Sequence, residues 1–319
     1  MLQTTPLFSV VIPLYNKEEC VRRSLDSVLR QAYSDFELII VNDGSTDGSV
    51  AVVQSYNDER IKLISQRNQG VSVARNNGVL AARGKWVAFL DADDQYHSQF
   101  LKRIAESIVR FPDAGCVYAR VDWLKQGEVI NLHHGQVAET EAKMLPDYLG
   151  HVVFENGLEI NTSGVSIRRD VFDSTGLFPV GVEVGEDSDL WLRVAWCTKL
   201  VYIPESLSTY FMDDGDSDWE QEQDREAYWL ETYRKWLNEG KIPDELTASA
   251  EAYRQKYYLA KALRFALLND KKRARRIIRQ HAFIRKAPIK DYILAWLYAY
   301  VPRELLKFAL RLINKKLSQ

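Results

Sequence analysis

The sequence has few cysteines and no long apolar run, and each shortage excludes a class of protein. Cys20, Cys116 and Cys197 lie far apart and form no CxxC pair, which argues against a disulfide framework and fits a reducing compartment. The apolar stretch 8–14 is too short for the core of a signal peptide. The apolar run 292–301 is about half of the roughly 20 residues that span a bilayer. We therefore expect a cytoplasmic chain without a transmembrane helix.

Length and composition describe an ordinary globular protein. The chain has 319 residues, of which 46% are hydrophobic and 27% are charged, as in soluble domains generally. This length suits one large domain with an appendage. We place the end of the first domain at residue 215 and assign 216–319 to a helical region, because helix-forming polar and aromatic stretches dominate there.

Short β-branched runs alternate with stretches of helical spacing over the first third of the chain. Such alternation is typical of an α/β protein with a mainly parallel central sheet that helices flank. A hairpin is expected at 116–123 and 128–131. The expected strands are 8–13, 36–41, 61–64 and 86–90, and the expected helices are 16–31, 49–56, 70–82 and 99–110.

Polar residues follow three of the expected strands directly. They are Tyr15-Asn16 after the first strand, Asp43 after the second, and the run 91–94 after the fourth. Ligands of open α/β sheets bind at the carboxyl ends of the strands. The coincidence predicts a binding site there.

Asp91-Ala92-Asp93-Asp94 places carboxylates two residues apart at the end of an apolar strand. Mg²⁺ and Mn²⁺ prefer such oxygen ligands and usually share their site with substrate phosphates. A metal ion there would neutralise charge as a nucleotide diphosphate departs. The alternative is an acidic turn that begins the next helix.

Three further residues carry candidate chemistry, each beside a plainer interpretation. Asp43 can accept a base imide or ribose hydroxyl, or it serves only the turn at Gly44. Arg75, early on a helix, can pair with phosphate or is a surface arginine. Asp187, beside Glu186 at the start of a helix, is a candidate general base or simple helix N-terminal charge.

Together these segments resemble the family 2 glycosyltransferases, which have the GT-A fold. The resemblance covers roughly residues 7–212 and depends on several pieces in sequence order rather than on one motif. The matching segments are VIPLYN at 11–16, VNDGSTD at 41–47, the run 70–78 with Ala74-Arg75-Asn76, LDADD at 90–94, Thr162-Ser163, Arg168-Arg169, Gly176-Leu177-Phe178, and Glu186-Asp187 with Trp191 and Arg193.

The resemblance implies a metal-dependent, inverting glycosyltransferase in residues 1–215, with Mn²⁺ or Mg²⁺ as cofactor. It also implies a role for single residues. Pro13, Tyr15 and Glu18 would line the nucleoside pocket, Asp43 would contact the base, Arg75 would lie near base or phosphate, Asp91 and Ala92 would contact the donor, Asp91 and Asp93 would hold the metal, and Asp187 would be the base.

The chain departs from the family after the candidate base. Many relatives carry Tyr-Arg-x-His there, whereas this chain has Tyr210-Phe211-Met212-Asp213. Asp213 is either a further oxygen ligand or part of an acidic run, 213–218, that orders over the donor as a flap. We prefer the flap.

The end of the chain is strongly basic. Residues 271–319 contain 14 Lys and Arg against two acidic residues, a net charge of +12, although the whole chain carries −2. Tryptophan and tyrosine interleave with this charge, as in helices that lie in a membrane interface. The alternative is helices that pack on protein. Nucleic-acid binding is not expected, because no recognised module accompanies the tail.

The sequence thus predicts transfer of a sugar from a UDP- or dTDP-sugar to a glycan or lipid-linked hydroxyl acceptor, in the synthesis of a bacterial surface polysaccharide, lipopolysaccharide or glycoconjugate. The enzyme would be cytoplasmic or peripheral on the inner membrane. One rival is a non-catalytic sugar-nucleotide-binding or scaffold protein. Another is a nucleotidyltransferase, but the glycine-rich loop and following lysine that it needs after the first strand are absent.

Overall fold

The computed structural model describes residues 5–130, 141–155, 157–182, 184–212, 226–281 and 289–301. The chain forms two compact units, one from residues up to 146 together with 158–241, the other from 147–157 together with residues from 242 onward. The boundary follows Lys241 rather than residue 215, because α9 (Trp229–Asn238) belongs to the first unit. Its Trp236 ring lies 5.6 Å from that of Trp196 on α7 (Glu186–Cys197).

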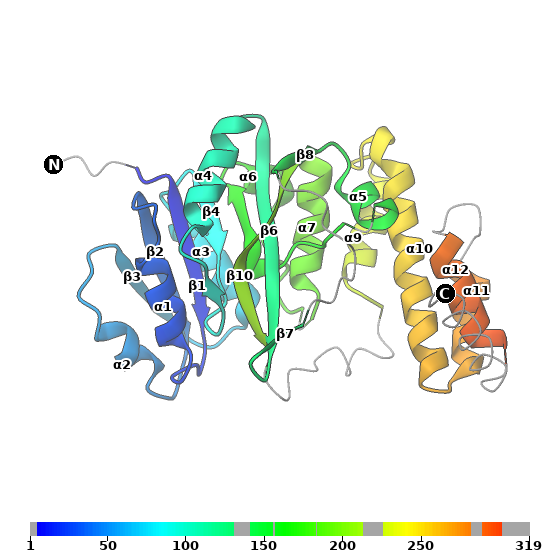
Figure 1. Ribbon diagram of the computed structural model, residues 1–319, viewed down its shortest axis with the longest axis horizontal. Helices are drawn as coiled ribbons and strands as arrows, with labels where there is room; N and C mark the ends of the chain where they lie inside the picture. Colours follow the sequence, from blue (N-terminus) through cyan, green and yellow to red (C-terminus); the bar gives the residue numbers. More distant parts are fainter. Residues whose placement is uncertain are drawn as a thin grey trace, which may run out of the picture. The chain divides into compact units, whose positions relative to one another are not determined.

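One sheet organises the first unit (Figure 1). In the described residues its path runs β3-β2-β1-β4-β9-β6-β10-β5, with β7 beside β6 and β8 beside β10. The pairs among β1, β2, β3 and β4 are parallel, whereas β9 is antiparallel to β4 and β6. The α/β fold is confirmed, with a mixed sheet. The strands are β1 (Phe8–Leu14), β2 (Phe36–Asp43), β3 (Ile61–Gln66), β4 (Trp86–Phe89), β5 (Gln95–Tyr96), β6 (Ala114–Lys125), β7 (Glu128–Ile130), β8 (Lys143–Leu145), β9 (Val165–Arg168) and β10 (Lys199–Met212).

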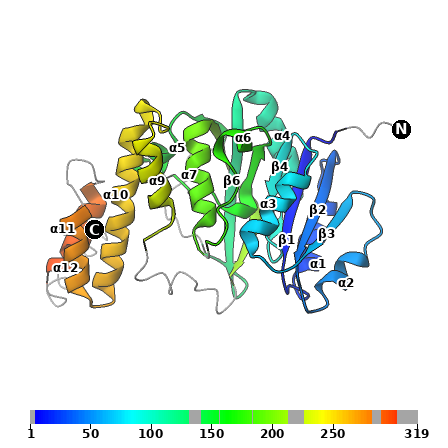
Figure 2. The same cartoon turned by 180° about the vertical axis from the view of Figure 1, so that it is seen from behind.

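Helices cover both faces of this sheet. Figure 1 shows α1 and α4 on one face, and Figure 2 shows α3 and α7 on the other. The expected hairpin is confirmed as β6 and β7, which pair antiparallel. Besides α7 and α9, the helices of the unit are α1 (Val21–Leu29), α2 (Ser49–Gln54), α3 (Val71–Ala81), α4 (Phe100–Arg110), α6 (Val171–Thr175) and the 3₁₀ turn η1 (Thr162–Gly164).

The helix expected over 16–31 begins only at Val21. Asn16 has φ 49, in the left-handed region, which interrupts a helix at that point. Residues 15–18 therefore form a loop, and the first strand delivers this loop to the sheet edge where β2 and β4 also end.

The two faces of β1 pack against different helices. Phe8, Val10, Ile12 and Leu14 share one buried cluster with residues of α1 and α4, as the two-residue period of a strand requires. On the other face a Cβ on Gly78 would lie 2.3 Å from Cγ1 of Val11, so only glycine lets α3 approach so closely. This close packing sets the position of the first turns of α3 at the sheet edge.

The second unit is helical. It consists of α5 (Tyr148–Phe154), α10 (Asp244–Leu267), α11 (Lys271–His281) and α12 (Ile289–Tyr300). Its buried cluster joins α10, α11 and α12 through Leu259, Ala262, Phe265, Ala266, Ala274, Ile278, Ala295 and Ala299. In the described part of the chain, no helix combines the length and apolar character that crossing a bilayer demands.

Candidate functional site

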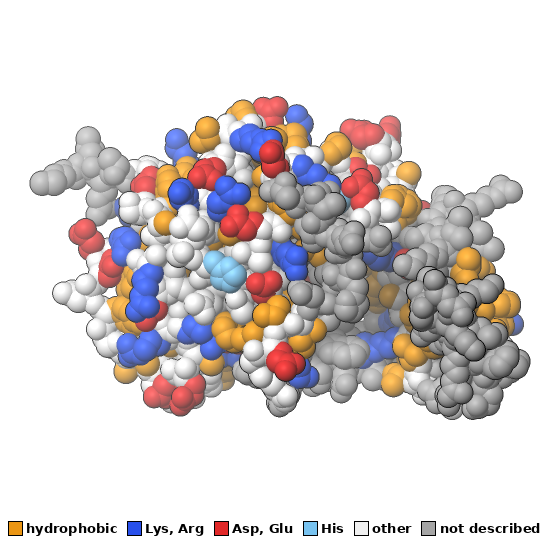
Figure 3. Space-filling view, viewed as in Figure 1, with side chains coloured by type: hydrophobic (Ala, Val, Ile, Leu, Met, Phe, Trp, Pro, Cys, Tyr) orange, Lys and Arg blue, Asp and Glu red, His pale blue; other side chains and the backbone are white. Residues whose placement is uncertain are grey.

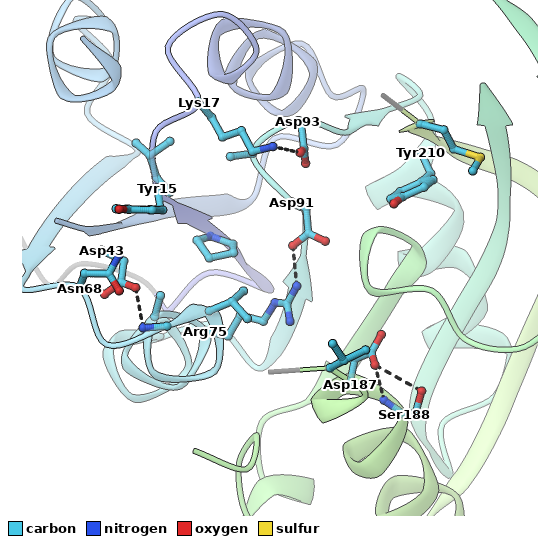
Figure 4. Close-up of a pocket in the computed structure, with 18 of the residues that line it drawn as sticks. Tyr15, Lys17, Asp43, Asn68, Arg75, Asp91, Asp93, Asp187, Ser188 and Tyr210 are labelled. Atoms are coloured by element: carbon cyan, nitrogen blue, oxygen red, sulfur yellow. Dashed lines mark hydrogen bonds and ion pairs between the residues drawn. The ribbon is translucent and has the colours of Figure 1, made fainter. Parts of the chain in front are cut away.

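A cleft of about 980 Å³ opens where β1, β2 and β4 end (Figure 4). β1 lies between β2 and β4, and open α/β sheets bind ligands at such a switch in strand order. The cleft is lined by Pro13, Leu14, Tyr15, Lys17, Asp43, Asn68, Gly70, Val71, Ala74, Arg75, Asp91, Ala92, Asp93, Trp123, Glu159, Val184, Asp187, Ser188, Tyr210 and Met212.

Glu18 lies outside this lining and has a structural contact instead. Its Oε2 accepts a hydrogen bond from the backbone of Gly48, at 2.8 Å. Asn16 strengthens the same junction, because its Oδ1 accepts from the backbone N–H of Thr46. These contacts fix the loop after β1 against the turn after β2. Tyr15, 47% exposed, is held at the cleft.

Asp43 is buried at the end of β2, and its carboxylate shapes the turn opposite. Oδ1 accepts from the side chain of Gln66 at 2.8 Å and from the backbone of Gln69 at 2.9 Å, while Oδ2 accepts from the backbone of Gly70 at 2.8 Å. A carboxylate has roughly four acceptor positions. Asp43 therefore retains one acceptor position, and the residue lines the cleft beside Asn68.

Arg75 joins two acidic segments that are distant in sequence. Its Nη2 lies 2.8 Å from Oδ1 of Asp91, after β4, and its Nη1 lies 2.7 Å from Oε1 of Glu186, at the start of α7. The arginine side chain is only 6% exposed. Burial alone would lower the pKa of Arg75, but the charges of Asp91 and Glu186 raise it above its usual value. The guanidinium is therefore a fixed charge beneath the cleft.

The first residues of α7 place two carboxylates side by side, and their environments differ. Burial raises the pKa of Glu186, the charge of Asp187 adds to this, and Arg75 opposes it. Asp187 faces the cleft across from Tyr15 and Asp43 (Figure 4). Its Oδ1 accepts from the backbone N–H of Ser188 at 2.6 Å and from the hydroxyl at 3.3 Å.

The turn after β4 is fastened by Asp94. This carboxyl is fully buried, accepts a hydrogen bond from the hydroxyl of Ser163, and accepts another from the backbone of Phe211 at 3.2 Å. Burial raises the pKa of Asp94 well above its usual value, and the charge of Asp91 adds to this. The sequence drew attention to Asp94 but gave it no role. In the structure it ties the turn to the end of β10.

Asp91 and Asp93 fit a cation that shares its site with a ligand. Among the described residues, no three Asp, Glu, His or Cys side chains form a group that would hold a metal ion. Mg²⁺, however, is commonly bound by one or two carboxylates, with substrate phosphates and water completing its shell. Two carboxylates at the cleft match that pattern and do not match an all-protein cage. Asp213 and the run 213–218 lie outside the described residues.

The structure gathers most of the predicted site residues and adds others. Lys17 stands two positions after Tyr15 in the same loop, and this proximity could have revealed it. Trp123 and Tyr210, whose ring centroids are 4.8 Å apart, come from β6 and β10. The comparison with the family's Tyr-Arg-x-His segment touched Tyr210 without giving it a role, and nothing in the sequence marked Trp123. The predicted residues that line the cleft are Pro13, Tyr15, Asp43, Arg75, Asp91, Ala92, Asp93 and Asp187.

Residues 9–176 match the family described as Glycosyl transferase family 2. The uncharacterized glycosyltransferase EpsJ of Bacillus subtilis is 45% identical over 103 residues, covering 32% of this chain and 30% of that protein. The uncharacterized glycosyltransferase alr2836 of Nostoc sp. is 34% identical over 209 residues, 63% of each. Glycosyltransferase GlyA of Streptococcus pneumoniae is 38% identical over 219 residues, 65% of this chain and 31% of that protein. The chain spans less than two thirds of each.

Solved structures share the fold. S. aureus TarS 1-349 in complex with UDP-GlcNAc superposes with a TM-score of 0.61 and 19% identity, covering 86% of this chain and 92% of that one. The same protein in complex with UDP gives a TM-score of 0.57 with 18% identity, covering 91% and 90%.

Proposed function

Because the chain belongs to glycosyl transferase family 2, we propose that it transfers a sugar from a nucleotide diphosphate donor to a hydroxyl acceptor, with inversion. One observation carries the proposal. Asp43, Asp91, Asp93 and Asp187 come from three separate segments and line a single cleft. TarS, which has a similar fold, binds UDP-GlcNAc, and this supports a UDP-sugar as donor.

Two groups of residues in the cleft would bind the two parts of the donor, its nucleoside and its diphosphate. Pro13, Tyr15 and Asp43 would receive the nucleoside, since an exposed aromatic ring and a carboxylate with spare acceptor capacity suit a base and its imide N–H. Asp91 and Asp93 would hold Mn²⁺ or Mg²⁺, which supplies charge neutralisation at the departing diphosphate.

Asp187 is assigned as the general base. The bonds from Ser188 fall on Oδ1, so we assign Oδ2 to the acceptor. It takes the hydroxyl proton while the acceptor oxygen forms a bond to the anomeric carbon. The bond from that carbon to the diphosphate breaks on the opposite face, and the diphosphate leaves with the electron pair. Attack in line with the leaving group inverts the anomeric configuration.

A donor panel tests this proposal. We expect the chain to release nucleotide from one of UDP-GlcNAc, UDP-glucose and dTDP-glucose in the presence of Mn²⁺. EDTA, or Asp93→Ala, should lower that rate about 100-fold, because charge on the diphosphate is then unopposed. Released UDP or dTDP is measured by coupled assay, with the exposed Asp170→Ala as the matched control.

Other results would separate the alternatives. A donor that raises the melting temperature of the chain, while no donor is turned over with either Mn²⁺ or Mg²⁺, would favour the non-catalytic binding protein. Full turnover by Asp93→Ala in EDTA would show that the reaction needs no metal at this site.

We also propose that α11 and α12 bring the chain to an anionic membrane, where it acts in assembly of a bacterial surface glycan. On the face drawn in Figure 3, described basic and acidic side chains of the first unit are interspersed. By contrast α11 has the sequence KKRARRIIRQH, without an acidic residue. Lys272, Arg276 and Arg279 are exposed and, at i, i+4 and i+7, share one side of the helix.

The neighbouring helix offers apolar and aromatic side chains. Ile293 is 52% exposed and Trp296 is 43% exposed on α12. The Tyr300 ring stacks on Trp296 with centroids 5.4 Å apart, and the Arg275 guanidinium of α11 lies 5.1 Å from the Tyr300 centroid. Aromatic rings beside cations suit the headgroup region of a bilayer.

Neutralising the basic side of α11 should weaken membrane binding strongly. Each Lys or Arg near an anionic surface contributes about 1 kcal/mol, so Lys272→Gln/Arg276→Gln/Arg279→Gln should bind about 100-fold more weakly. Co-sedimentation with vesicles of phosphatidylcholine and phosphatidylglycerol, 3:1, measures this. Arg30→Gln/Lys62→Gln/Lys102→Gln makes the same charge change on exposed residues of the first unit. Equal binding of the two triple variants would contradict the proposal. So would equal binding of the parent chain to the mixed vesicles and to vesicles of phosphatidylcholine alone.

A further inference from the structure

Lys17 forms an ion pair with Asp93, one of the two aspartates that we propose as metal ligands. Its Nζ lies 2.5 Å from Oδ2 of Asp93, and both side chains line the cleft (Figure 4). They are half-buried, at 36% and 21% exposure. An ammonium at this distance and a divalent cation would compete for the same carboxylate.

The backbone around Lys17 is fixed, so only its side chain can leave. The Lys17 N–H donates to the hydroxyl of Ser49 at 2.9 Å. Its carbonyl accepts from the backbone of Cys20 at 3.0 Å and of Val21 at 2.8 Å, at the start of α1. The flexible four-carbon stem is therefore the moving part.

The turn that bears Asp93 is fixed as well. Arg23 donates from Nη2 to the carbonyl of Asp93, and its guanidinium lies 3.6 Å from the centroid of the Phe211 ring. The hydroxyl of Ser24 bonds to the carbonyls of Ala92 at 2.8 Å and Asp94 at 2.7 Å. Separation of Lys17 from Asp93 thus requires neither backbone to move.

The partner of Asp91 contrasts with this. Arg75 is almost fully buried and is shared between Asp91 and Glu186. A planar guanidinium that is buried between two carboxylates exchanges poorly, whereas a half-exposed ammonium on a flexible stem exchanges readily. Of the two aspartates proposed to hold the metal, Asp93 is the one with a displaceable cation.

We propose that Lys17 is an exchangeable counter-ion: it holds Asp93 while the cleft lacks a donor, and it passes to the donor diphosphate when a divalent cation takes Asp93. The inference rests on the proposed function, because it needs both the metal and the diphosphate. A metal ion that arrives alone must break the Lys17–Asp93 pair. One that arrives with a diphosphate gives the ammonium a new partner, so metal and nucleotide bind cooperatively.

Manganese binding tests the exchange without any turnover. Mn²⁺ dissociation constants are measured by electron paramagnetic resonance with and without UDP, for the parent chain, Lys17→Met and Lys17→Arg. We expect Lys17→Met to bind Mn²⁺ alone roughly two- to fivefold more tightly, since a half-exposed ion pair is worth about that factor. UDP should tighten Mn²⁺ binding several-fold in the parent and much less in Lys17→Met. Lys17→Arg should resemble the parent.

Three results would overturn the inference. One is an unchanged or weaker affinity of Lys17→Met for Mn²⁺ alone. Another is a gain equally large in Lys62→Met, which removes an exposed lysine elsewhere in the same unit. A third is a Mn²⁺ affinity that Asp93→Asn leaves unchanged, because this result would show that Asp93 does not bind the metal. In that last case the donor panel still reports whether the chain transfers sugar.

Discussion

Asp187→Asn is expected to lower turnover of the donor about 100- to 10,000-fold, the range that a positioned general base contributes. The amide is nearly the same size and can still accept from Ser188 through its oxygen, so the start of α7 should keep its geometry. It cannot take a proton from the acceptor. The measurement is nucleotide release under saturating donor, alongside UDP affinity, which should stay at the parental value.

Two further variants serve as controls for Asp187→Asn. Asp173→Asn changes an exposed aspartate in the same unit and should retain full turnover. Glu186→Gln removes the adjacent carboxylate, which is paired with Arg75 rather than directed to the acceptor. If Asp187→Asn turns over at the parental rate while Glu186→Gln is inactive, the base has been assigned to the wrong residue of the pair.

Arg75→Met should reduce the free energy of unfolding by about 3 kcal/mol, because removing one partner of a buried ion pair leaves uncompensated charge. Here the loss leaves two carboxylates, Asp91 and Glu186, without their shared cation. Urea unfolding followed by tryptophan fluorescence measures the change. Adding Glu186→Gln should restore part of the stability, since it removes one of the two charges.

Arg103 provides the matched control. It also bridges two carboxylates, Glu106 at 2.8 Å and Glu205 at 2.7 Å, but all three side chains are exposed. Arg103→Met should therefore cost under about 1 kcal/mol. An equally small cost for Arg75→Met, or no recovery with Glu186→Gln, would refute the buried network as a source of stability.

The destabilisation by Arg75→Met should also depend on pH. Burial already raises the pKa of Glu186 in the folded chain, and loss of the arginine would raise it further. A carboxyl with a raised folded-state pKa binds its proton more tightly when folded. Stability therefore falls as pH rises through that pKa. The variant should lose more stability at pH 8 than at pH 5.

The strands and the residues at their ends were predictable because their signals are local. Runs such as 8–13 and 36–41 are apolar without interruption, and polar residues follow immediately. Parallel strands bring those ends to one edge, so Tyr15, Asp43 and Asp91 meet once the order is 2-1-4. Asp187 was a candidate base from its place at the start of a helix, but no spacing connects it to the sheet edge, and only the family resemblance placed it in the same site.

The links between these segments were not predictable from spacing. Arg75 and Glu186 are 111 positions apart, and a helix position alone gives no partner for a guanidinium. The same holds for Lys17 on Asp93. The resemblance placed Glu18 in the nucleoside pocket, whereas its carboxylate accepts a hydrogen bond from the backbone of Gly48. Spacing could not predict this bond, because a carboxylate near a cleft is equally able to accept from a neighbouring backbone N–H.

The helical unit borrows residues 147–157 from the middle of the chain, where α5 packs with α10 and Val152 accepts a hydrogen bond from Lys256 at 3.0 Å. Replacing the helical unit with that of a relative therefore requires two exchanged segments, 147–157 and the residues from 242 onward. A chimaera joined only after Lys241 would combine α5 of one parent with α10 of the other. Successful grafts should carry the internal segment along with the tail.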